Sequence, residues 1–385
     1  MKPVPGMQHP VLDTLPTPAL LVDEARMKAN IDRMAKHLQQ LGVPLRPHLK
    51  TCKNIELARR LLAGQPGGAA VSTLAEADYF FEHGIDDLLY AVGIAPGKLD
   101  AVAERMAQGM KLTLILDHAD TARAVADAAL RLKTRFRLLL EVDADGQRAG
   151  FKPESEGLLA AADILRGAEC KVAGVLVHAG GSYLCRSTDC IRAMAEAERQ
   201  AAVKAAKRLC LAGHQIEQVS IGSTPTASFA SDLSGITEVR AGVHVFHDLV
   251  MAGLGVCAID DIALSVLTEV IGHRSDTGRV LVDAGWMALS RDRGRAPAAP
   301  DRGYGLLRGL DGSDIGEIIV TGTNQEHGII GRADAQALAL DAFPIGSRWR
   351  ILPNHACATA GQYRDFWLIG QPETAVHALQ RAQGW

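Results

Sequence analysis

The chain has 385 residues and a formal net charge of −3 at pH 7, with 48% hydrophobic and 22% charged residues. This length suffices for two domains, or for one large barrel with a smaller partner domain. The slightly acidic charge provides no general basic field for nucleic acid, and an aromatic content of 4% argues against stacking platforms for bases. No apolar run reaches the length that a membrane span requires.

The cysteines are seven in number, scattered, and without a C-x-x-C pair. This pattern is typical of free thiols in a reducing compartment and not of a disulfide framework. Residues 1–15 lack a basic segment followed by an apolar core, so we expect no signal peptide. We therefore predict a soluble cytoplasmic protein. The cysteines are Cys52, Cys170, Cys185, Cys190, Cys210, Cys257 and Cys357.

Strand-like and helical segments alternate from residue 17 to about residue 250. A first strand over 17–23 leads through Asp23, a predicted N-cap, into a helix over 24–41 with apolar residues at helical spacing. About eight strand–helix units follow from Leu45, which is the pattern of a (β/α)8 barrel. A doubly wound sheet is the alternative, but no G-x-G-x-x-G motif follows the first strand. The predicted strands cover 43–49, 68–73, 87–91, 111–117, 136–142, 171–177, 216–221 and 237–245, and the predicted helices cover 54–63, 74–83, 96–109, 118–132, 156–167 and 188–212.

The pattern changes near residue 255, where helical periodicity nearly disappears. Runs rich in valine and isoleucine, separated by glycine and proline turns, predict strands instead. The stretch 292–304 has no periodicity and is expected to be a loop. We therefore predict an α/β chain with a TIM-like barrel over 16–254 and a mainly β domain formed by 1–15 and 255–385. The predicted strands of this domain cover 264–271, 279–283, 315–321 and 349–352.

Lys50 lies at the end of the segment 43–51, in which Pro44 and Pro47 rule out a helix interior. The segment therefore predicts a strand whose hydrogen-bond ladder ends at Lys50. An amine held there among apolar neighbours is a candidate Schiff-base former, because desolvation disfavours its protonated form and leaves a nucleophile. A solvated lysine at the start of a loop is the alternative.

Reactive residues of a (β/α)8 barrel lie at the carboxyl ends of its strands. Two glycine-containing turns at such ends, 222–226 and 242–243, offer N–H groups that can hold a phosphate, although simple turns are the alternative. A strand-end lysine facing such turns suits pyridoxal 5′-phosphate, which needs an imine at one end and a dianion anchor at the other. The other strand-end candidates are Ser72, Thr73, Asp117, Asp143, Arg148, His178, the segment 180–183, and Arg240.

A second candidate site lies in the predicted β domain at His355 and Cys357. These two residues are two positions apart on a segment that we expect to be extended. Their side chains would therefore lie on one face and could share a metal ion. Imidazole and thiolate together favour zinc, and two protein ligands would leave positions for water or substrate. A core histidine beside a buried thiol is the alternative. Gln325 and His327, in the polar cluster 324–328, are further candidates, unless that cluster is a loop with satisfied hydrogen bonds.

These motifs, in this order along nearly the whole chain, resemble those of the alanine racemase-like, fold type III, pyridoxal phosphate enzymes. Within this family the resemblance is greatest to the D-serine dehydratases and D-threo-3-hydroxyaspartate dehydratases, which share their fold with D-threonine aldolases. The segments that carry the resemblance are 46–51 (Arg-Pro-His-Leu-Lys-Thr), 142–150, 178–180 (His-Ala-Gly), 222–226 (Gly-Ser-Thr-Pro-Thr), 239–242 and 353–357 (Pro-Asn-His-Ala-Cys).

The resemblance implies that Lys50 is the catalytic residue and holds the cofactor as a Schiff base. Other matched residues would bind the phosphate or lie beside the cofactor ring, and Arg240 stands where racemases place an arginine against the pyridine nitrogen. The implied phosphate-binding residues are Gly222, Ser223, Thr224, Gly242 and Val243, and those implied near the ring are Arg148, His178 and Tyr183.

The resemblance also implies that His355 and Cys357 are the zinc ligands of a dehydratase, although other divalent metals can serve. The comparable aldolases have His-x-Asp here, and an oxygen ligand suits magnesium or manganese better. Cys357 therefore favours a dehydratase. No racemase-type catalytic tyrosine motif is evident in the β domain, which counts against an alanine racemase.

The implied activity is elimination of the β-hydroxyl from a small D-3-hydroxy amino acid, D-threo-3-hydroxyaspartate or D-serine, to give a 2-oxo acid and ammonia. The resemblance favours hydroxyaspartate. A metal-dependent, D-threonine aldolase-type retro-aldol enzyme is the alternative. A non-catalytic pyridoxal-binding protein is a more distant one, but such proteins lack a β domain, whereas about 130 residues follow residue 255 here. The resemblance further implies a homodimer in which each β domain completes the partner's site.

Overall fold

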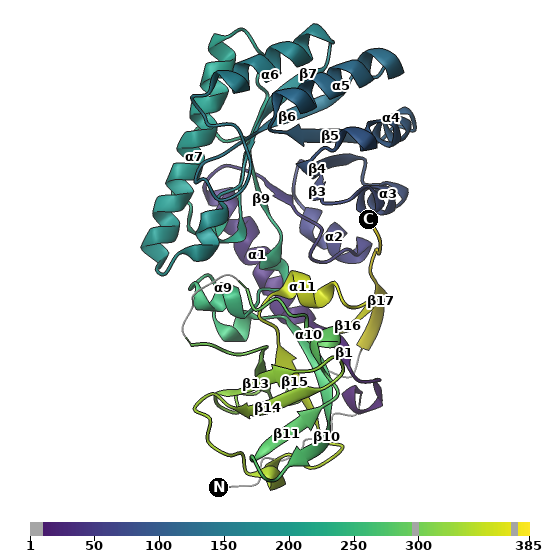
Figure 1. The fold of residues 1–385 in the computed structure, drawn as a ribbon, viewed down its shortest axis with the longest axis vertical. Coiled ribbons are helices and arrows are strands. Elements are labelled where there is room, and N and C mark those ends of the chain that lie inside the picture. Colours follow the sequence, from purple (N-terminus) through teal and green to yellow (C-terminus); the bar gives the residue numbers. More distant parts are fainter. Residues whose placement is uncertain (1–10, 295–299, 371–375) are drawn as a thin grey trace. The chain divides into compact units, whose positions relative to one another are not determined.

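The computed structural model describes residues 11–294, 300–370 and 376–385 (Figure 1). The chain forms two compact units, Met1–Ile31 with Val243–Arg381 and Asp32–Gly242 with Ala382–Trp385. The predicted boundaries at 16 and 254 do not coincide with this division. Strand β1 (Ala19–Asp23) hydrogen-bonds with two strands of the first unit, and the Leu249 N–H donates to Pro353 O, which also lies there. The parts of the predicted β domain and loop at 1–10, 295–299 and 371–375 lie outside the described residues.

Eight parallel strands form a barrel in the second unit, which confirms the predicted fold class. Their order is β2-β9-β8-β7-β6-β5-β4-β3. The ring closes where His48 bridges to Ala70 and the Leu49 N–H donates to Ala70 O over 2.8 Å. The strands are β2 (Leu45–Pro47), β3 (Ala69–Val71), β4 (Asp87–Gly93), β5 (Lys111–Leu116), β6 (Arg137–Val142), β7 (Lys171–Val177), β8 (Gln218–Ile221) and β9 (Glu238–Ala241).

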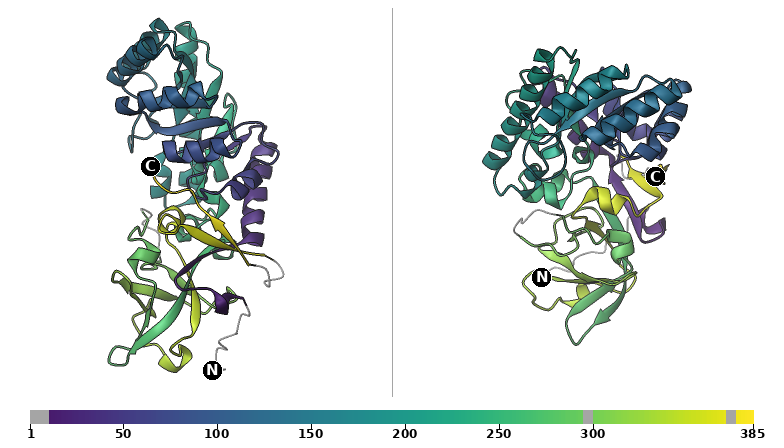
Figure 2. Two further views of the ribbon diagram at one scale, coloured as in Figure 1. Left: turned by 90° about the vertical axis from the view of Figure 1, so that its right-hand side faces the viewer. Right: turned by 45° about the horizontal axis from the view of Figure 1, so that its top comes forward.

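Helices surround these strands, as Figure 2 shows. Several begin at polar residues whose side chains accept a backbone N–H of the first turn, which is the preferred way to start a helix. The predicted N-cap Asp23 is one, with its Oδ1 2.9 Å from the Arg26 N–H. Asn54 and Ser187 act likewise. The helices are α1 (Glu24–Gln40), α2 (Ile55–Leu62), α3 (Leu74–Glu82), α4 (Leu99–Ala107), α5 (Ala119–Leu132), α6 (Glu156–Gly167), α7 (Thr188–Leu211) and α8 (Thr224–Phe229).

The interior of the barrel is filled by small and aliphatic side chains from successive strands. These side chains bury apolar surface, which is the main favourable contribution to folding. This part of the barrel is therefore a packed core. The cluster comprises Ala70, Leu89, Ile115, Leu139, Ala173 and Leu176.

The first unit contains a nine-stranded sheet, in agreement with the predicted mainly β domain. Six of its strands (β10, β11, β14, β13, β12 and β15) pair in a closed antiparallel ring, and β1, β16 and β17 extend the sheet from β10. The strands are β10 (Leu264–Arg274), β11 (Arg279–Val282), β12 (Leu306–Arg308), β13 (Ile318–Thr323), β14 (Gly328–Arg332), β15 (Arg348–Leu352), β16 (Asp365–Ile369) and β17 (Val376–Gln380).

Short helices connect these strands and the barrel elements. No helix among the described residues is both long enough and apolar enough to cross a membrane. The short α-helices are α9 (Leu249–Gly253), α10 (Trp286–Leu289) and α11 (Ala356–Ala360), and the 3-10 helices are η1 (Leu12–Thr14), η2 (Pro96–Lys98), η3 (Gly180–Leu184), η4 (Val243–Val245), η5 (Ile259–Asp261) and η6 (Leu340–Ala342).

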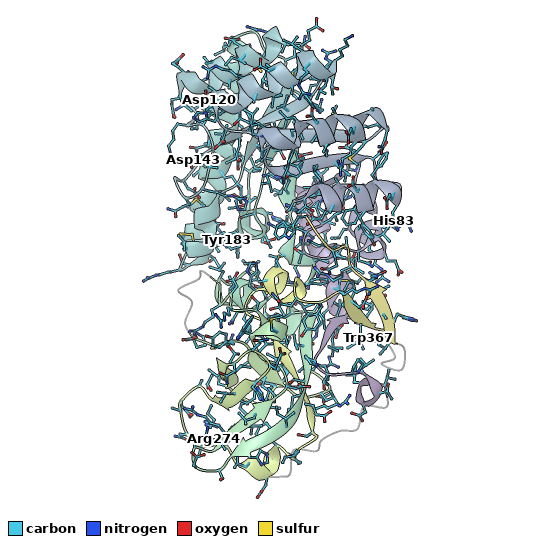
Figure 3. All side chains as sticks on the ribbon, turned by 45° about the vertical axis from the view of Figure 1, so that its right-hand side comes forward. His83, Asp120, Asp143, Tyr183, Arg274 and Trp367 are labelled. Atoms are coloured by element: carbon cyan, nitrogen blue, oxygen red, sulfur yellow. A yellow bond between two sulfur atoms is a disulfide. The ribbon has the colours of Figure 1, made fainter. Side chains whose placement is uncertain are left out.

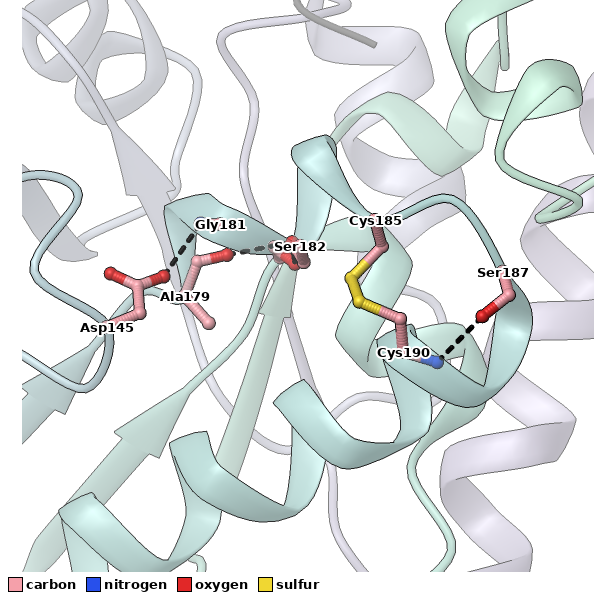
Figure 4. Close-up of a disulfide and its surroundings, with 8 residues drawn as sticks. Asp145, Ala179, Gly181, Ser182, Cys185, Ser187 and Cys190 are labelled. Atoms are coloured by element: carbon pink, nitrogen blue, oxygen red, sulfur yellow. Dashed lines mark hydrogen bonds between the residues drawn. A yellow bond between two sulfur atoms is a disulfide. The ribbon is translucent and has the colours of Figure 1, made fainter. Parts of the chain in front are cut away.

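The expectation that all cysteines are free thiols is wrong for one pair. A disulfide joins Cys185 to Cys190 at the start of α7 (Figure 4). The chain turns at the N-cap Ser187, whose Oγ accepts the Cys190 N–H. This turn places the two Cα atoms 5.6 Å apart, within the normal range for a disulfide. The other five cysteines are not disulfide-bonded.

The buried guanidinium of Arg46 links three strands of the barrel. It donates to Glu238 Oε2 over 2.8 Å and to Asp87 Oδ1 over 3.0 Å. Arg46→Met should lower the free energy of unfolding of the barrel by about 3–5 kcal/mol, because the buried Glu238 loses its partner. The exposed pair of Arg131 and Asp100 supplies the control, since Arg131→Met should cost about 0–1 kcal/mol. Equal losses in urea unfolding would contradict the expected role of Arg46.

Candidate active site

Lys50 follows β2 at the carboxyl end of the barrel, as the sequence predicts. The bridge between His48 and Ala70 is the last strand pairing before it. Leu49 is fully buried, whereas Lys50 is exposed. The expectation that apolar neighbours enclose the amine is therefore not met, because Lys50 lies in the turn after the strand, beyond its last pairing.

Three predicted site residues and Arg240 lie around the imidazole of His48. Burial lowers the pKa of His48 well below its ordinary value, and the positive charges of Lys50, Arg240 and Arg148 lower it further, as does His178. Burial, together with the same three charged side chains, lowers the pKa of His178 to about 4. Both imidazoles are therefore neutral at pH 7. The mouth of the barrel thus concentrates positive charge on lysine and arginine, which suits an anionic ligand.

Arg148 lies on the loop that follows β6. The carboxylate of Asp143 accepts the Gly146 N–H over 2.6 Å, and Asp117 Oδ2 accepts the Gly150 N–H over 3.1 Å. Asp143 is labelled in Figure 3. An added Cβ at Gly150 would lie 2.4 Å from Asp143 N, so only glycine fits there. These contacts fix the loop that carries the Arg148 guanidinium.

Arg240 is buried inside the barrel on β9. It donates to Ser220 Oγ over 2.5 Å and to Val177 O over 2.7 Å. Burial lowers the pKa of Arg240, whereas nearby carboxylates, Glu238 first among them, oppose that shift. The guanidinium is therefore tied to three adjacent strands and has little freedom to move.

The turn after β8 is shaped by Gly222. Its φ is +137°, and an added Cβ would lie 2.1 Å from Arg240 O, so no other residue fits. Its N–H donates to Glu198 Oε1 over 3.1 Å, and its carbonyl lies 3.0 Å from His178 Nδ1. The Ser223 N–H donates to Thr226 Oγ1 over 3.1 Å. The N–H groups of Gly222 and Ser223, expected to face a phosphate, are therefore used within the chain.

Thr224 presents a hydroxyl that the described part of the chain does not satisfy. The residue is 1% exposed, and its Oγ1 has no hydrogen-bond partner among the described residues. A buried polar atom without a partner is costly, so native structures usually supply one. A phosphate oxygen would satisfy this hydroxyl. Gly242 is also constrained, because an added Cβ would lie 3.0 Å from His48 O, and Val243 is the next residue along the chain.

Tyr183 lies in η3, on the loop after β7 (Figure 3). Its ring centroid is 6.3 Å from that of His178. Asp145 Oδ2 accepts the Gly181 N–H over 2.7 Å (Figure 4). Ser182 Oγ lies 3.0 Å from Ser223 Oγ. This loop therefore contacts both the Arg148 loop and the turn after β8.

Glu198, on α7, is a residue that the strand-end pattern does not predict. It is completely buried, and burial raises its pKa. Its Oε1 accepts the Ala179 N–H over 2.8 Å and the Gly222 N–H over 3.1 Å. The sequence does carry one signal, since Glu198 follows Ala195 and precedes Ala202 at the spacing of the apolar helix face. A carboxylate on such a face needs a buried partner.

His355 and Cys357 lie together, but not on an extended segment as predicted. His355 is the N-cap of α11 and Cys357 is in its first turn. Burial alone would lower the pKa of His355, but hydrogen bonds to Asp292 and Cys357 raise it to about 11. A metal ion would compete with this proton for the imidazole. Within the described ranges, no group of three or more such ligands occurs.

The polar cluster at 324–328 is a turn between β13 and β14. The Asn324 N–H donates to His327 O over 2.8 Å. The carbonyls of Asn324 and Gln325 accept the N–H groups of Trp286 and Met287 in α10. The reading as a loop with satisfied hydrogen bonds therefore fits Gln325 and His327.

Two family models match successive parts of the chain. A family model described as "Alanine racemase, N-terminal domain" matches residues 22–249, and one described as "Putative serine dehydratase domain" matches residues 263–369. The D-threo-3-hydroxyaspartate dehydratase of Delftia sp. (strain HT23) is 46% identical over 382 residues, which cover 98% of this chain and 100% of that protein. The D-serine dehydratase of Dictyostelium discoideum is 28% identical over 97% of this chain and 98% of its own length.

Solved structures agree with this result. A D-threo-3-hydroxyaspartate dehydratase with a cysteine-to-alanine mutation, described as metal-free, superposes with a TM-score of 0.95 at 45% identity, covering 97% of this chain and 99% of that one. The chain therefore belongs to the alanine racemase-like, fold type III family of pyridoxal phosphate enzymes. Within it, the chain belongs with the D-threo-3-hydroxyaspartate and D-serine dehydratases.

The neutral state of His178 makes the barrel sensitive to acid. Its pKa is about 4 in the folded protein, below the ordinary 6.5, so the unfolded chain binds a proton first as the pH falls. Its contribution to stability is complete above pH 6.5 and declines towards pH 4. Between pH 7.5 and 4.5 the wild type should lose about 2–3 kcal/mol more unfolding free energy than His178→Asn. Urea unfolding at both pH values checks this, and equal losses would refute it.

Proposed function

We propose that the protein is a pyridoxal phosphate- and zinc-dependent dehydratase that removes the β-hydroxyl of a D-3-hydroxy amino acid and releases a 2-oxo acid and ammonia. The observation that carries this proposal is the contact between the His355 imidazole and the Cys357 thiol. This sulfur ligand stands where the comparable aldolases have an oxygen ligand, and D-threonine aldolases are also more distant relatives of the chain. D-threo-3-hydroxyaspartate is the proposed substrate, ahead of D-serine.

The residues at the barrel mouth fit pyridoxal phosphate. Lys50 supplies the amine, and the Thr224 hydroxyl supplies a buried donor without a partner in the described chain. We assign the phosphate to the turn of Gly222, Ser223 and Thr224 together with the Gly242 and Val243 amides. Since the first two N–H groups of that turn have protein acceptors, their role is to shape the turn. Arg148, His178 and Tyr183 are assigned to the surroundings of the ring.

When bound, pyridoxal phosphate withdraws electrons from the bonds at the substrate Cα. The Nζ of Lys50 then takes the Cα proton as a general base. A single base on one face of the substrate accepts only one configuration at Cα, which by resemblance is D. His178 is neutral at pH 7, so it adds no competing charge beside this proton transfer.

His355 and Cys357 are proposed to hold zinc, although other divalent metals remain candidates. An imidazole with a thiolate suits zinc better than it suits magnesium. A zinc ion there supplies a Lewis acid that improves a hydroxyl as a leaving group. The two ligands lie at the start of α11, directly after β15, so one turn of the chain presents both. We further propose a homodimer, by resemblance, and a cytoplasmic location.

Product analysis tests the proposed reaction. Protein supplied with pyridoxal phosphate and zinc should convert D-threo-3-hydroxyaspartate to oxaloacetate and ammonia, or D-serine to pyruvate and ammonia. Glycine with an aldehyde product would contradict dehydration and indicate the aldolase. Lys50→Ala should lower turnover at least about 10³-fold and remove the absorbance of the lysine-bound cofactor. Lys111→Ala changes an exposed lysine at the start of β5 and should leave turnover unchanged.

Removing the metal or its sulfur ligand tests the Lewis-acid role. Chelation should stop ammonia release, and added zinc should restore it. Cys357→Ala should lower turnover at least about 100-fold while the cofactor stays bound, because several kcal/mol of leaving-group stabilisation is lost. Cys210→Ala, at an exposed position on α7, is the matched control. Full turnover by metal-free protein would reject this role.

A further inference from the structure

Asp292 contacts the imidazole of His355 although 63 residues separate them in the sequence. Its Oδ2 lies 2.7 Å from His355 Nδ1, the distance of a charge-assisted hydrogen bond. An imidazole that donates Nδ1–H to a carboxylate is held in one tautomer, with the lone pair on Nε2. Nε2 is then the nitrogen that can bind a metal ion.

The carboxylate of Asp292 is itself held in place. Its Oδ1 accepts the Gly294 N–H over 2.8 Å, and its own N–H donates to Ser290 Oγ over 3.1 Å. The guanidinium of the preceding residue, Arg291, lies 4.4 Å from the ring centroid of Trp286. Asp292 therefore offers His355 a fixed acceptor and not a mobile side chain.

The backbone next to His355 is fixed from another direction. The Ala356 N–H donates over 2.9 Å to Oδ2 of the buried Asp248, whose Oδ1 accepts the Met251 N–H over 2.9 Å. The start of α11 is thereby attached to the start of α9. With the backbone held, the orientation of the His355 ring is the main remaining freedom, and the contact with Asp292 restricts it.

We infer that Asp292 is a positioning residue that orients the His355 imidazole towards the metal ion. This inference rests on the proposed metal site at His355 and Cys357. Carboxylates that hold metal-binding histidines typically contribute about 10–100-fold to metal affinity. Asp292→Ala should weaken zinc binding by about that factor, and Asp292→Asn should weaken it less, because an amide oxygen can still accept the Nδ1–H.

Zinc affinity is measured on the full-length protein with its cofactor bound, by competition with a chromogenic chelator. Asp341→Asn, at an exposed position in η6, is the matched control and should bind zinc as the wild type does. Cobalt(II) in place of zinc adds a spectroscopic readout. In Asp292→Ala the thiolate-to-cobalt charge-transfer band should persist because Cys357 is intact. The d–d bands should change because the imidazole is no longer held. A loss of fold alone would not keep the charge-transfer band while changing the d–d bands.

The outcomes separate this inference from the proposed function. If the wild type does not bind zinc, or if Cys357→Ala binds it equally well, the metal site itself is wrong. If Cys357→Ala loses zinc while Asp292→Ala and Asp292→Asn both keep wild-type affinity and cobalt spectra, the metal site stands and the role of Asp292 is overturned. If Asp292→Ala does not fold, Asp292→Asn decides alone: weaker binding with changed d–d bands supports the role, and wild-type behaviour refutes it.

Discussion

One buried carboxylate joins the ends of two neighbouring barrel strands, and the geometry of the candidate cofactor site depends on it. Glu198 accepts N–H groups from Ala179 and Gly222, which follow β7 and β8. Gly222 in turn offers its carbonyl to His178 and leads into the turn that ends at Thr224. The contact therefore fixes the separation between the imidazole and the candidate phosphate turn. Backbone groups that would otherwise be unsatisfied in the interior are paired by the same carboxylate.

The parts of the fold that were predictable from sequence are those specified by local patterns. Alternating strands and helices, with capping residues such as Asp23 and Asn54, define the barrel because each unit is specified by its own neighbours in the chain. Strands β12, β14, β16 and β17 were missed, and long-range pairing supports the first three of them. β12 has only three residues and β14 contains two glycines, so these two strands carry little local preference. This reason does not apply to β16, whose sequence is rich in strand-forming residues.

The candidate site shows the same limit at the level of single residues. Lys50 could be selected because prolines and a strand end surround it, and His355 and Cys357 because they are close in sequence. The partners that hold these groups, Glu198 and Asp292, lie far away in the chain, so only the folded structure shows them. The disulfide between Cys185 and Cys190 was missed for another reason. It depends on a turn at the start of α7, and C-x4-C spacing by itself does not predict one.

The placement of β1 between β10 and β16 bears on how the chain folds during synthesis. β1 leaves the ribosome before the whole barrel, whereas its two partner strands are made after it. Such distant pairing closes late, because the intervening chain must be ordered first. The barrel strands can pair as they emerge, while this early segment waits for the last part of the polypeptide. Until then β1 exposes both of its edges, which could pair with another chain, so aggregation during biosynthesis is a specific hazard of this arrangement.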